Sequence, residues 1–254
     1  RLLKRGASTV EIYDVLTVSD IREACDLFLP VFKKTGGEHG FVSLEVLPSL
    51  AFDENATVKE AERLFRLADR PNIMIKVPAT GPGIRAVRRL IGEGINVNVT
   101  LIFSQKNYRD AANAYLEGLE IFVKKGGDLK SVHSVASVFV SRIDTKADHI
   151  LGAFADKTNA IEAKRNINFL KGKIAIANSK LIYQKFKEIF NDRNFGGLEA
   201  AGGHVQRPLW ASTSSKNPAY SDLIYVENLI GPSTVNTMPH QTAQAFMDHG
   251  RFAL

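Results

Sequence analysis

The sequence predicts an α/β fold of the TIM (β/α)8-barrel type, formed by residues 1–254 as a single domain. Short β-rich segments alternate with helical patterns along the chain, which is typical of parallel βαβ units. The chain has 254 residues, 44% of them hydrophobic, which is enough to bury one large core. Polar residues stand near the ends of several β-rich segments, where barrels of this type place their active sites.

Six strands are predicted from β-branched and apolar composition. They span residues 40–47, 72–79, 95–102, 132–140, 207–213 and 234–238. A closed barrel of this type takes eight strands. We therefore expect a barrel whose first two strands are missing from this chain.

Helical periodicity fills the segments between the strands. It covers residues 57–68, 82–92, 104–125, 144–155 and 172–190. Four glycines then predict a flexible return to the sheet: Gly196, Gly197, Gly202 and Gly203. Before the first strand we expect two helices, 10–16 and 19–34, the second opened by Ser19 as N-cap.

The charge and cysteine content exclude several classes of protein. Lys and Arg number 33 against 27 Asp and Glu, a net charge of +6 that suits phosphorylated substrates. The charges are spread along helical segments without a basic tail, so we expect no nucleic-acid partner. Cys25 is the single cysteine, which rules out an intrachain disulfide and indicates a small core residue. No apolar run approaches the roughly 20 residues of a membrane span.

Lys76 stands in the middle of the apolar strand 72–79. Burial of a lysine can lower its pKa from about 10.4 towards about 7 to 8, where the free amine attacks carbonyl groups. The position therefore predicts a lysine that forms a Schiff base with a sugar. Two other interpretations stay open: Lys76 lies on an edge strand, or its ammonium reaches out to water.

A carboxylate and a row of polar side chains lie on two other predicted strands. Glu45 stands among apolar neighbours as a proton carrier, or as a salt-bridge partner of Lys76. Asn96, Asn98 and Thr100 alternate along their strand and therefore share one face. Polar groups inside a barrel are costly unless they find partners, so we expect a site there.

Hydroxyl groups and cations follow the two late strands. The fourth strand carries Ser137 and runs into Arg142, while Ser214 and Lys216 follow the fifth. Such groups at the ends of late strands suit a phosphate. The segment from Ser214 to Lys216 is equally compatible with an ordinary polar loop.

Five motifs occur in order along essentially the whole chain. They are VSLEV (42–46), IKVPAT (75–80), GINVNVTLIFS (94–104), FVSRID (139–144) and RPLWASTSSKNPAY (207–220). Together they resemble the transaldolase family, in its bacterial-type branch. The combination is much more specific than any single motif.

The resemblance implies a role for each candidate residue. Lys76 would be the Schiff-base lysine, and Glu45 would work with Thr100 through an activated water. Asn98 and Ser137 match positions that hold the hydroxyls of a bound dihydroxyacetone unit.

The same resemblance implies a phosphate site. Arg142 and Ser214 match phosphate-binding positions, and Lys216 stands where several relatives have arginine. Lysine keeps the positive charge but lacks the planar bidentate fork of arginine.

The implied activity is a transaldolase of the pentose phosphate pathway. It would transfer a dihydroxyacetone unit from fructose 6-phosphate or sedoheptulose 7-phosphate to an aldose phosphate, with no metal or organic cofactor. We expect sugar-phosphate substrates, no membrane partner, a homo-oligomer, and a cytoplasmic location with the plastid as alternative. Two other functions stay open: a fructose 6-phosphate aldolase, or a non-catalytic sugar-phosphate-binding barrel fragment in which Lys76 merely pairs with Glu45.

The chain departs from the family pattern at both ends. Family members carry an acid–base aspartate on the first barrel strand and an asparagine on the second, and neither motif occurs before Phe41. They also close the barrel with a final helix, where only residues 241–254 follow here. We therefore expect a barrel domain truncated at both ends.

Overall fold

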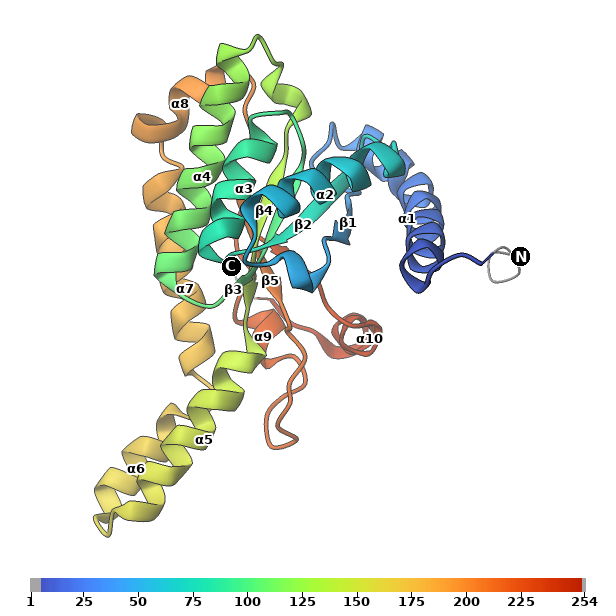
Figure 1. Cartoon of the computed structure of the whole chain (residues 1–254). Coiled ribbons are helices and arrows are strands. Elements are labelled where there is room, and N and C mark those ends of the chain that lie inside the picture. Colours follow the sequence, from blue (N-terminus) through green and yellow to red (C-terminus); the bar gives the residue numbers. More distant parts are fainter. Residues whose placement is uncertain (1–5, 253–254) are drawn as a thin grey trace. The chain divides into compact units, whose positions relative to one another are not determined.

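The computed structural model describes residues 6–252, in which strands and helices alternate (Figure 1). The strands are β1 (Val42–Glu45), β2 (Ile73–Pro78), β3 (Val97–Ile102), β4 (Ser134–Phe139), β5 (Arg207–Ala211) and β6 (Val235–Asn236). The α-helices are α1 (Thr9–Lys34), α2 (Glu54–Ala68), α3 (Gly81–Ile91), α4 (Gln105–Lys124), α5 (Ser141–Lys157), α6 (Ile161–Leu170), α7 (Ile174–Ile189), α8 (Asp192–Ala200), α9 (Ile224–Glu227) and α10 (His240–His249). Two short 3-10 helices are η2 (Pro48–Leu50) and η3 (Leu129–Ser131).

The strands pair in sequence order within one sheet, β1-β2-β3-β4-β5-β6. Pairing is parallel between β1 and β2, between β4 and β5, and between β5 and β6. Each strand lies inside a segment predicted from the sequence. The α/β class with parallel strands is therefore confirmed, while the closed barrel and its two additional strands stay predictions.

The described residues group into two compact units. Unit 1 takes in the described residues up to Val99, with Asn113–Ser134 and Leu198–Val205. Unit 2 takes in Thr100–Ala112, Val135–Gly197 and the described residues from Gln206. Among residues 6–252, no helix combines the length and the apolar character that crossing a membrane requires.

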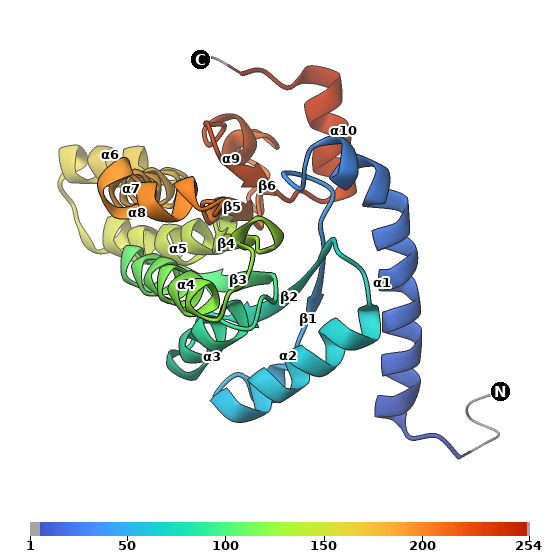
Figure 2. The same ribbon diagram turned by 90° about the horizontal axis from the view of Figure 1, so that it is seen from above.

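The core of unit 1 forms where helices cover β2. Helices α2 and α3 pack against each other and against β2 (Figure 2). Ile73, Ile75 and Val77 alternate along β2 and are fully buried, as expected where one face of a strand meets a helical layer. The intervening residues of β2, including Lys76, therefore point to the opposite face.

Helix α1 corrects the prediction of two N-terminal helices. It runs without interruption from Thr9 to Lys34, so Ser19 lies inside it instead of capping a second helix. The N-cap is Ser8, which exchanges hydrogen bonds with Glu11: the Glu11 N–H donates to Ser8 Oγ at 3.2 Å, and the Ser8 N–H donates to the Glu11 carboxylate at 2.8 Å. This capping box satisfies N–H groups at the helix start, and no glycine or proline interrupts residues 9–29.

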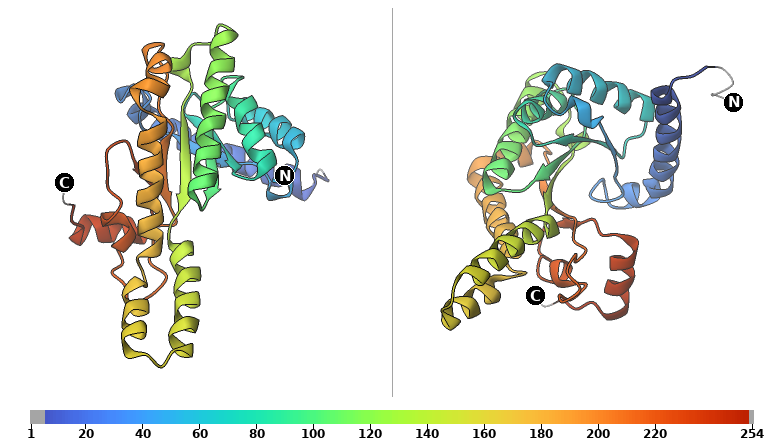
Figure 3. Two further views of the ribbon diagram at one scale, coloured as in Figure 1. Left: turned by 90° about the vertical axis from the view of Figure 1, so that its left-hand side faces the viewer. Right: turned by 60° about the horizontal axis from the view of Figure 1, so that its bottom comes forward.

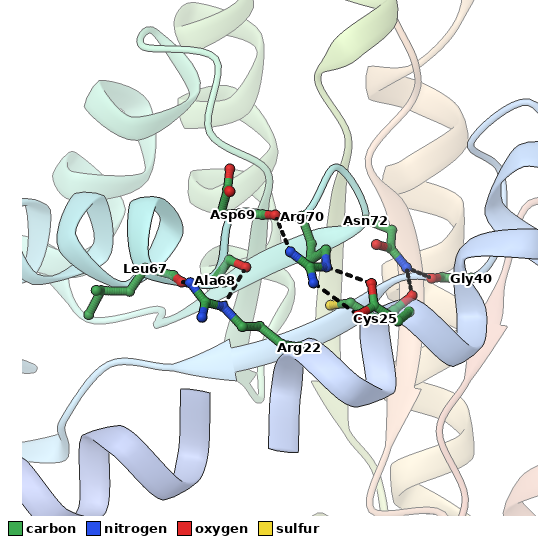
Figure 4. Close-up of polar contacts among 9 residues, drawn as sticks. Arg22, Cys25, Gly40, Leu67, Ala68, Asp69, Arg70 and Asn72 are labelled. Atoms are coloured by element: carbon green, nitrogen blue, oxygen red, sulfur yellow. Dashed lines mark hydrogen bonds and ion pairs between the residues drawn. The ribbon is translucent and has the colours of Figure 1, made fainter. Parts of the chain in front are cut away.

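Helix α1 is joined to the end of α2 and the start of β2 by side-chain hydrogen bonds (Figure 4). Arg22 donates to the carbonyl of Ala68 at 3.2 Å. The buried Asn72 amide donates to the carbonyls of Cys25 and Gly40 at 2.9 and 2.8 Å. Cys25 itself is fully buried, and burial raises the pKa of its thiol to about 11, which confirms it as a core residue.

Helices α5 to α8 occupy most of the long segment between β4 and β5. Helix α5 packs against α6 and α7, and α5 and α6 run side by side as a hairpin (Figures 1 and 3). Helix α8 corrects the expected flexible return, because Gly196 and Gly197 lie inside it. Phe195 of this helix is buried beside Phe190, and burial of this ring offsets the unfavourable helix propensity of glycine.

Candidate active site

Lys76 and Glu45 face each other on neighbouring strands of unit 1. The parallel register of β1 and β2 pairs the two residues directly. The Lys76 Nζ lies 3.6 Å from the Glu45 Oε2, and their side chains are 28% and 47% exposed. The amine is therefore shielded only in part, less than the sequence indicated. The edge-strand interpretation is wrong, since β2 lies between β1 and β3.

Asn98 lies near the same face of unit 1. It is 5% exposed, and its side-chain amide donates to the hydroxyl of Ser43 at 3.0 Å. Ser43 precedes Glu45 by two positions on β1, so the two side chains share a face of that strand. The sequence interpretation missed Ser43, although the same period-2 pattern could have found it.

Asn96 has a structural role that the sequence interpretation did not separate from its neighbours. It donates to the carbonyl of Ile73 at 3.2 Å and accepts from the N–H of His133 at 2.8 Å. The side chain thus joins the starts of neighbouring strands and satisfies buried main-chain groups. We therefore remove it from the candidate site.

The chain leaves β2 through a tightly packed turn. Thr80 caps α3, accepting from the N–H of Gly83 at 3.0 Å, and its hydroxyl also donates to the carbonyl of Ala51. A side chain at Gly83 would place its Cβ only 2.0 Å from the carbonyl oxygen of Pro78. Glycine is therefore required sterically at this position, which lies just past the strand that carries Lys76.

In unit 2, Thr100 and Ser137 are buried polar residues on β3 and β4, each 1% exposed. The hydroxyl of Thr100 has no hydrogen-bond partner among the residues that the structure describes. An unsatisfied buried hydroxyl is costly. A bound water or a catalytic role would account for a buried hydroxyl of this kind.

Arg142 and the loop after β5 are held next to each other in unit 2. Phe139 and Ala211 are paired in the register of β4 and β5. Beyond them, the N–H of Ser141 donates to the Ser212 carbonyl at 3.0 Å, and the two hydroxyls lie 2.9 Å apart. Arg142 follows directly in the first turn of α5, a position that favours an anion.

Ser214 and Lys216 continue that loop. The Lys216 ammonium donates to the Ser214 hydroxyl at 2.7 Å, and Lys216 is exposed. The guanidinium of Arg142 lies 4.7 Å from the centre of the Phe139 ring. All three polar groups are thus carried by segments that are joined at Ser141 and Ser212.

The comparison with known proteins decides the family. The family model described as Transaldolase/Fructose-6-phosphate aldolase matches residues 1–253. The chain belongs to the transaldolase/fructose-6-phosphate aldolase family. Its resemblance to transaldolases, predicted from the five motifs, is confirmed.

Individual relatives in this family are close in sequence and longer. A transaldolase of Trichodesmium erythraeum is 48% identical over 247 residues, which cover 97% of this chain and 65% of the relative. Transaldolase 1 of Streptomyces avermitilis is 49% identical, covering 98% of this chain and 64% of the relative. A transaldolase of Mycolicibacterium smegmatis is 47% identical with 98% and 65% covered. The chain thus spans just under two thirds of the length of these relatives.

The FVSRID motif of this transaldolase-family chain contains a further buried residue, Asp144. It is 1% exposed and accepts from the N–H of Ala175 at 2.7 Å and the hydroxyl of Tyr225 at 2.9 Å. Burial raises the pKa of the Asp144 carboxyl above its ordinary value, and the two hydrogen bonds oppose that rise. Asp144 therefore joins α5 to the start of α7 and to α9, a role that the sequence interpretation missed.

Proposed function

We propose that this chain carries the Schiff-base centre of a transaldolase, which moves a dihydroxyacetone unit from a ketose phosphate to an aldose phosphate. The observation that carries the proposal is the pair of Lys76 and Glu45. An amine and a carboxylate 3.6 Å apart, on adjacent parallel strands of a chain in this family, provide a nucleophile with a proton carrier beside it.

The chemistry follows from the amine. Neutral Lys76 attacks the C2 ketone of fructose 6-phosphate, and loss of water gives an iminium that withdraws electrons from C3. The C3–C4 bond breaks as the C4 hydroxyl gives its proton to the acid–base aspartate that family members carry on the first barrel strand, which later returns it to the new hydroxyl group. Glyceraldehyde 3-phosphate leaves, and the three-carbon enamine stays on the lysine. It adds to the aldehyde of erythrose 4-phosphate, and hydrolysis releases sedoheptulose 7-phosphate and the free amine.

Glu45 and Thr100 are proposed to hold the water that shuttles protons during formation and hydrolysis of the iminium. The partnerless buried hydroxyl of Thr100 supports a role in binding water. Asn98 and Ser137 are proposed to hold the hydroxyls of the dihydroxyacetone unit. The family resemblance supports these assignments, and the burial of Asn98, Thr100 and Ser137 is consistent with them.

Arg142, Ser214 and Lys216 are proposed to bind the distal phosphate of the substrate. A guanidinium, a hydroxyl and an ammonium complement a phosphate dianion. Binding there supplies orientation, and the bond-breaking chemistry occurs at Lys76.

The wider setting is also proposed. The relatives are about half as long again, and we propose that the six strands belong to an eight-stranded barrel whose other two strands lie outside these 254 residues. Action in the pentose phosphate pathway, a cytoplasmic location and a homo-oligomeric state stay predictions from the sequence.

Borohydride reduction in the presence of fructose 6-phosphate tests the central step. A reducible iminium at Lys76 should become a stable secondary amine, which peptide mass mapping locates. The matched control is the Lys106→Arg variant, because Lys106 is an exposed lysine on α4, and it should trap substrate as the unaltered chain does. An adduct at another lysine with Lys76 unmodified would refute the assignment.

The second candidate is a fructose 6-phosphate aldolase, because the family that the chain matches includes both activities. It would use the same iminium but release free dihydroxyacetone. Product analysis with and without an acceptor aldose separates the two, since a transferase needs the acceptor for turnover. Substrate binding without a trappable adduct would instead favour the non-catalytic interpretation, in which Lys76 serves only as the ionic partner of Glu45.

A further inference from the structure

The loop of residues 212–223, which we name the Ser214 loop, carries two of the proposed phosphate ligands on an exposed segment. Residues 216–219 are all exposed. Short local hydrogen bonds shape this segment: the N–H of Tyr220 donates to the carbonyl of Asn217 at 3.1 Å, and Ser215 donates to the same carbonyl at 2.9 Å. Contacts at its two ends must therefore set where Ser214 and Lys216 lie.

The first end of the Ser214 loop is attached to the start of α5. Ser212 has a left-handed backbone, with φ of 56°, which is unusual for a residue other than glycine. Its carbonyl accepts from the Ser141 N–H and its hydroxyl contacts the Ser141 hydroxyl. Ser141 immediately precedes Arg142.

A second attachment, at Tyr220, joins the Ser214 loop to α5 two turns further along the helix. The Tyr220 hydroxyl donates to one carboxylate oxygen of Asp148 at 2.6 Å, and the other oxygen accepts from the N–H of Gly172 at 3.0 Å. The Tyr220 ring covers Gly172 so closely that an added Cβ there would lie 2.9 Å from the ring. Burial and Asp148 raise the pKa of Tyr220 to about 12, so the phenol keeps its proton at neutral pH.

We propose that Tyr220 and Asp148 are positioning residues for substrate phosphate, holding the Ser214 loop on helix α5, whose first turn carries Arg142. Helix α5 thereby contributes to the placement of all three phosphate ligands: Arg142 lies in its first turn, and the two attachments hold the loop of Ser214 and Lys216. The buried Thr213 adds an attachment to β6, since its hydroxyl donates to the Asn236 side chain at 2.8 Å. This inference rests on the proposed phosphate role of these residues. It identifies two residues that touch no substrate but determine the affinity for its phosphate.

The Tyr220→Phe variant tests the proposal, because it removes the hydroxyl and keeps the ring on Gly172. The affinity for inorganic phosphate, measured by titration calorimetry, should fall about fivefold to twentyfold, because the loop loses one of the hydrogen bonds that hold it in the binding position. In borohydride trapping, the half-saturating concentration of fructose 6-phosphate should rise by the same factor, while the maximal trapping rate and the half-saturating concentration of unphosphorylated fructose stay constant.

The matched control is Tyr183→Phe. Tyr183 lies on α7 in the same unit, and its hydroxyl donates to the carbonyl of Pro232 at 3.1 Å, away from the Ser214 loop. This variant should bind phosphate as the unaltered chain does. Asp148→Asn keeps one acceptor oxygen, so it should weaken phosphate binding less than Tyr220→Phe.

Two results would overturn the inference. One is unchanged phosphate affinity in Tyr220→Phe while the unaltered chain binds phosphate, and the other is equal weakening in Tyr220→Phe and Tyr183→Phe. Absence of phosphate binding by the unaltered chain also overturns the inference, whether or not borohydride traps an adduct at Lys76. Failure of the proposed function looks different, because phosphate binding and its Tyr220 dependence would persist without a borohydride-trapped adduct at Lys76.

Discussion

The Lys76–Glu45 pair of unit 1 and the proposed phosphate ligands of unit 2 are held in different ways. Lys76 and Glu45 stand on adjacent strands, so the main-chain register places them. Their partly exposed side chains contribute little to the stability of the fold. Arg142 lies in the first turn of α5, and Ser214 lies on a loop that is attached to that helix at Ser141 and at the Asp148 carboxylate. Substitutions at the proposed site in unit 1 should therefore lower the reaction rate without lowering the free energy of unfolding. In unit 2, substitutions that weaken phosphate binding should also lower the free energy of unfolding.

The largest effect is expected from Lys76→Arg. A guanidinium stays protonated and is no nucleophile, so the rate of adduct formation with fructose 6-phosphate should fall by about 10⁴ or more. The free energy of unfolding should change by less than about 1 kcal/mol, because the side chain is partly exposed. Borohydride trapping and urea unfolding measure the two quantities, and adduct formation within tenfold of the unaltered rate would contradict the prediction.

Glu45→Gln should have the next largest effect. Removing a general acid–base group typically lowers rates by about 10² to 10⁴, while loss of an exposed ion pair costs at most about 1 kcal/mol. Single-turnover trapping rates should show the drop without a shift in the urea midpoint. If the free energy of unfolding fell by more than the activation free energy of trapping rose, the two units would not differ in the way described.

In unit 2, Asp144→Ala should lower the free energy of unfolding by about 2 to 3 kcal/mol, because the buried N–H of Ala175 and hydroxyl of Tyr225 lose their acceptor. The matched control is Asp110→Ala, which breaks only the surface ion pair with Lys106 and should cost less than about 0.5 kcal/mol. Urea unfolding measures both. Equal losses in the two variants would show that the Asp144 contacts contribute nothing special to unit 2.

The smallest effect is the pH dependence that Asp144 adds. Burial raises the pKa of its carboxyl in the folded state, so the folded state binds this proton more readily than the unfolded state. Its contribution to stability is therefore present at low pH and decreases as pH rises from the ordinary value of 3.8 through the raised pKa. The stability of the unaltered chain relative to Asp144→Asn should fall over that window in urea titrations, and a relative rise would reverse the assigned shift.

The sequence was informative where a structural feature depends on near neighbours. Runs of β-branched and apolar residues located all six strands, and the motifs around Lys76 and Glu45 predicted a centre that includes both residues. It failed at Ser19 and at Gly196, where local preferences for a cap or a flexible segment were outweighed by helices formed over a longer stretch. Propensities of about 1 kcal/mol per residue are easily exceeded by packing.

By itself the sequence determined the α/β class, the positions of the strands and the membership of the transaldolase/fructose-6-phosphate aldolase family. Only the tertiary structure decided how far Lys76 is shielded, that Asn98 bonds to Ser43, and that Asp144 and Asp148 hold tyrosines from 81 and 72 residues away. The physical reason is the separation along the sequence of the residues that interact. Strand and helix patterns arise within a few residues, whereas a buried polar atom finds its partner only when distant segments have packed together.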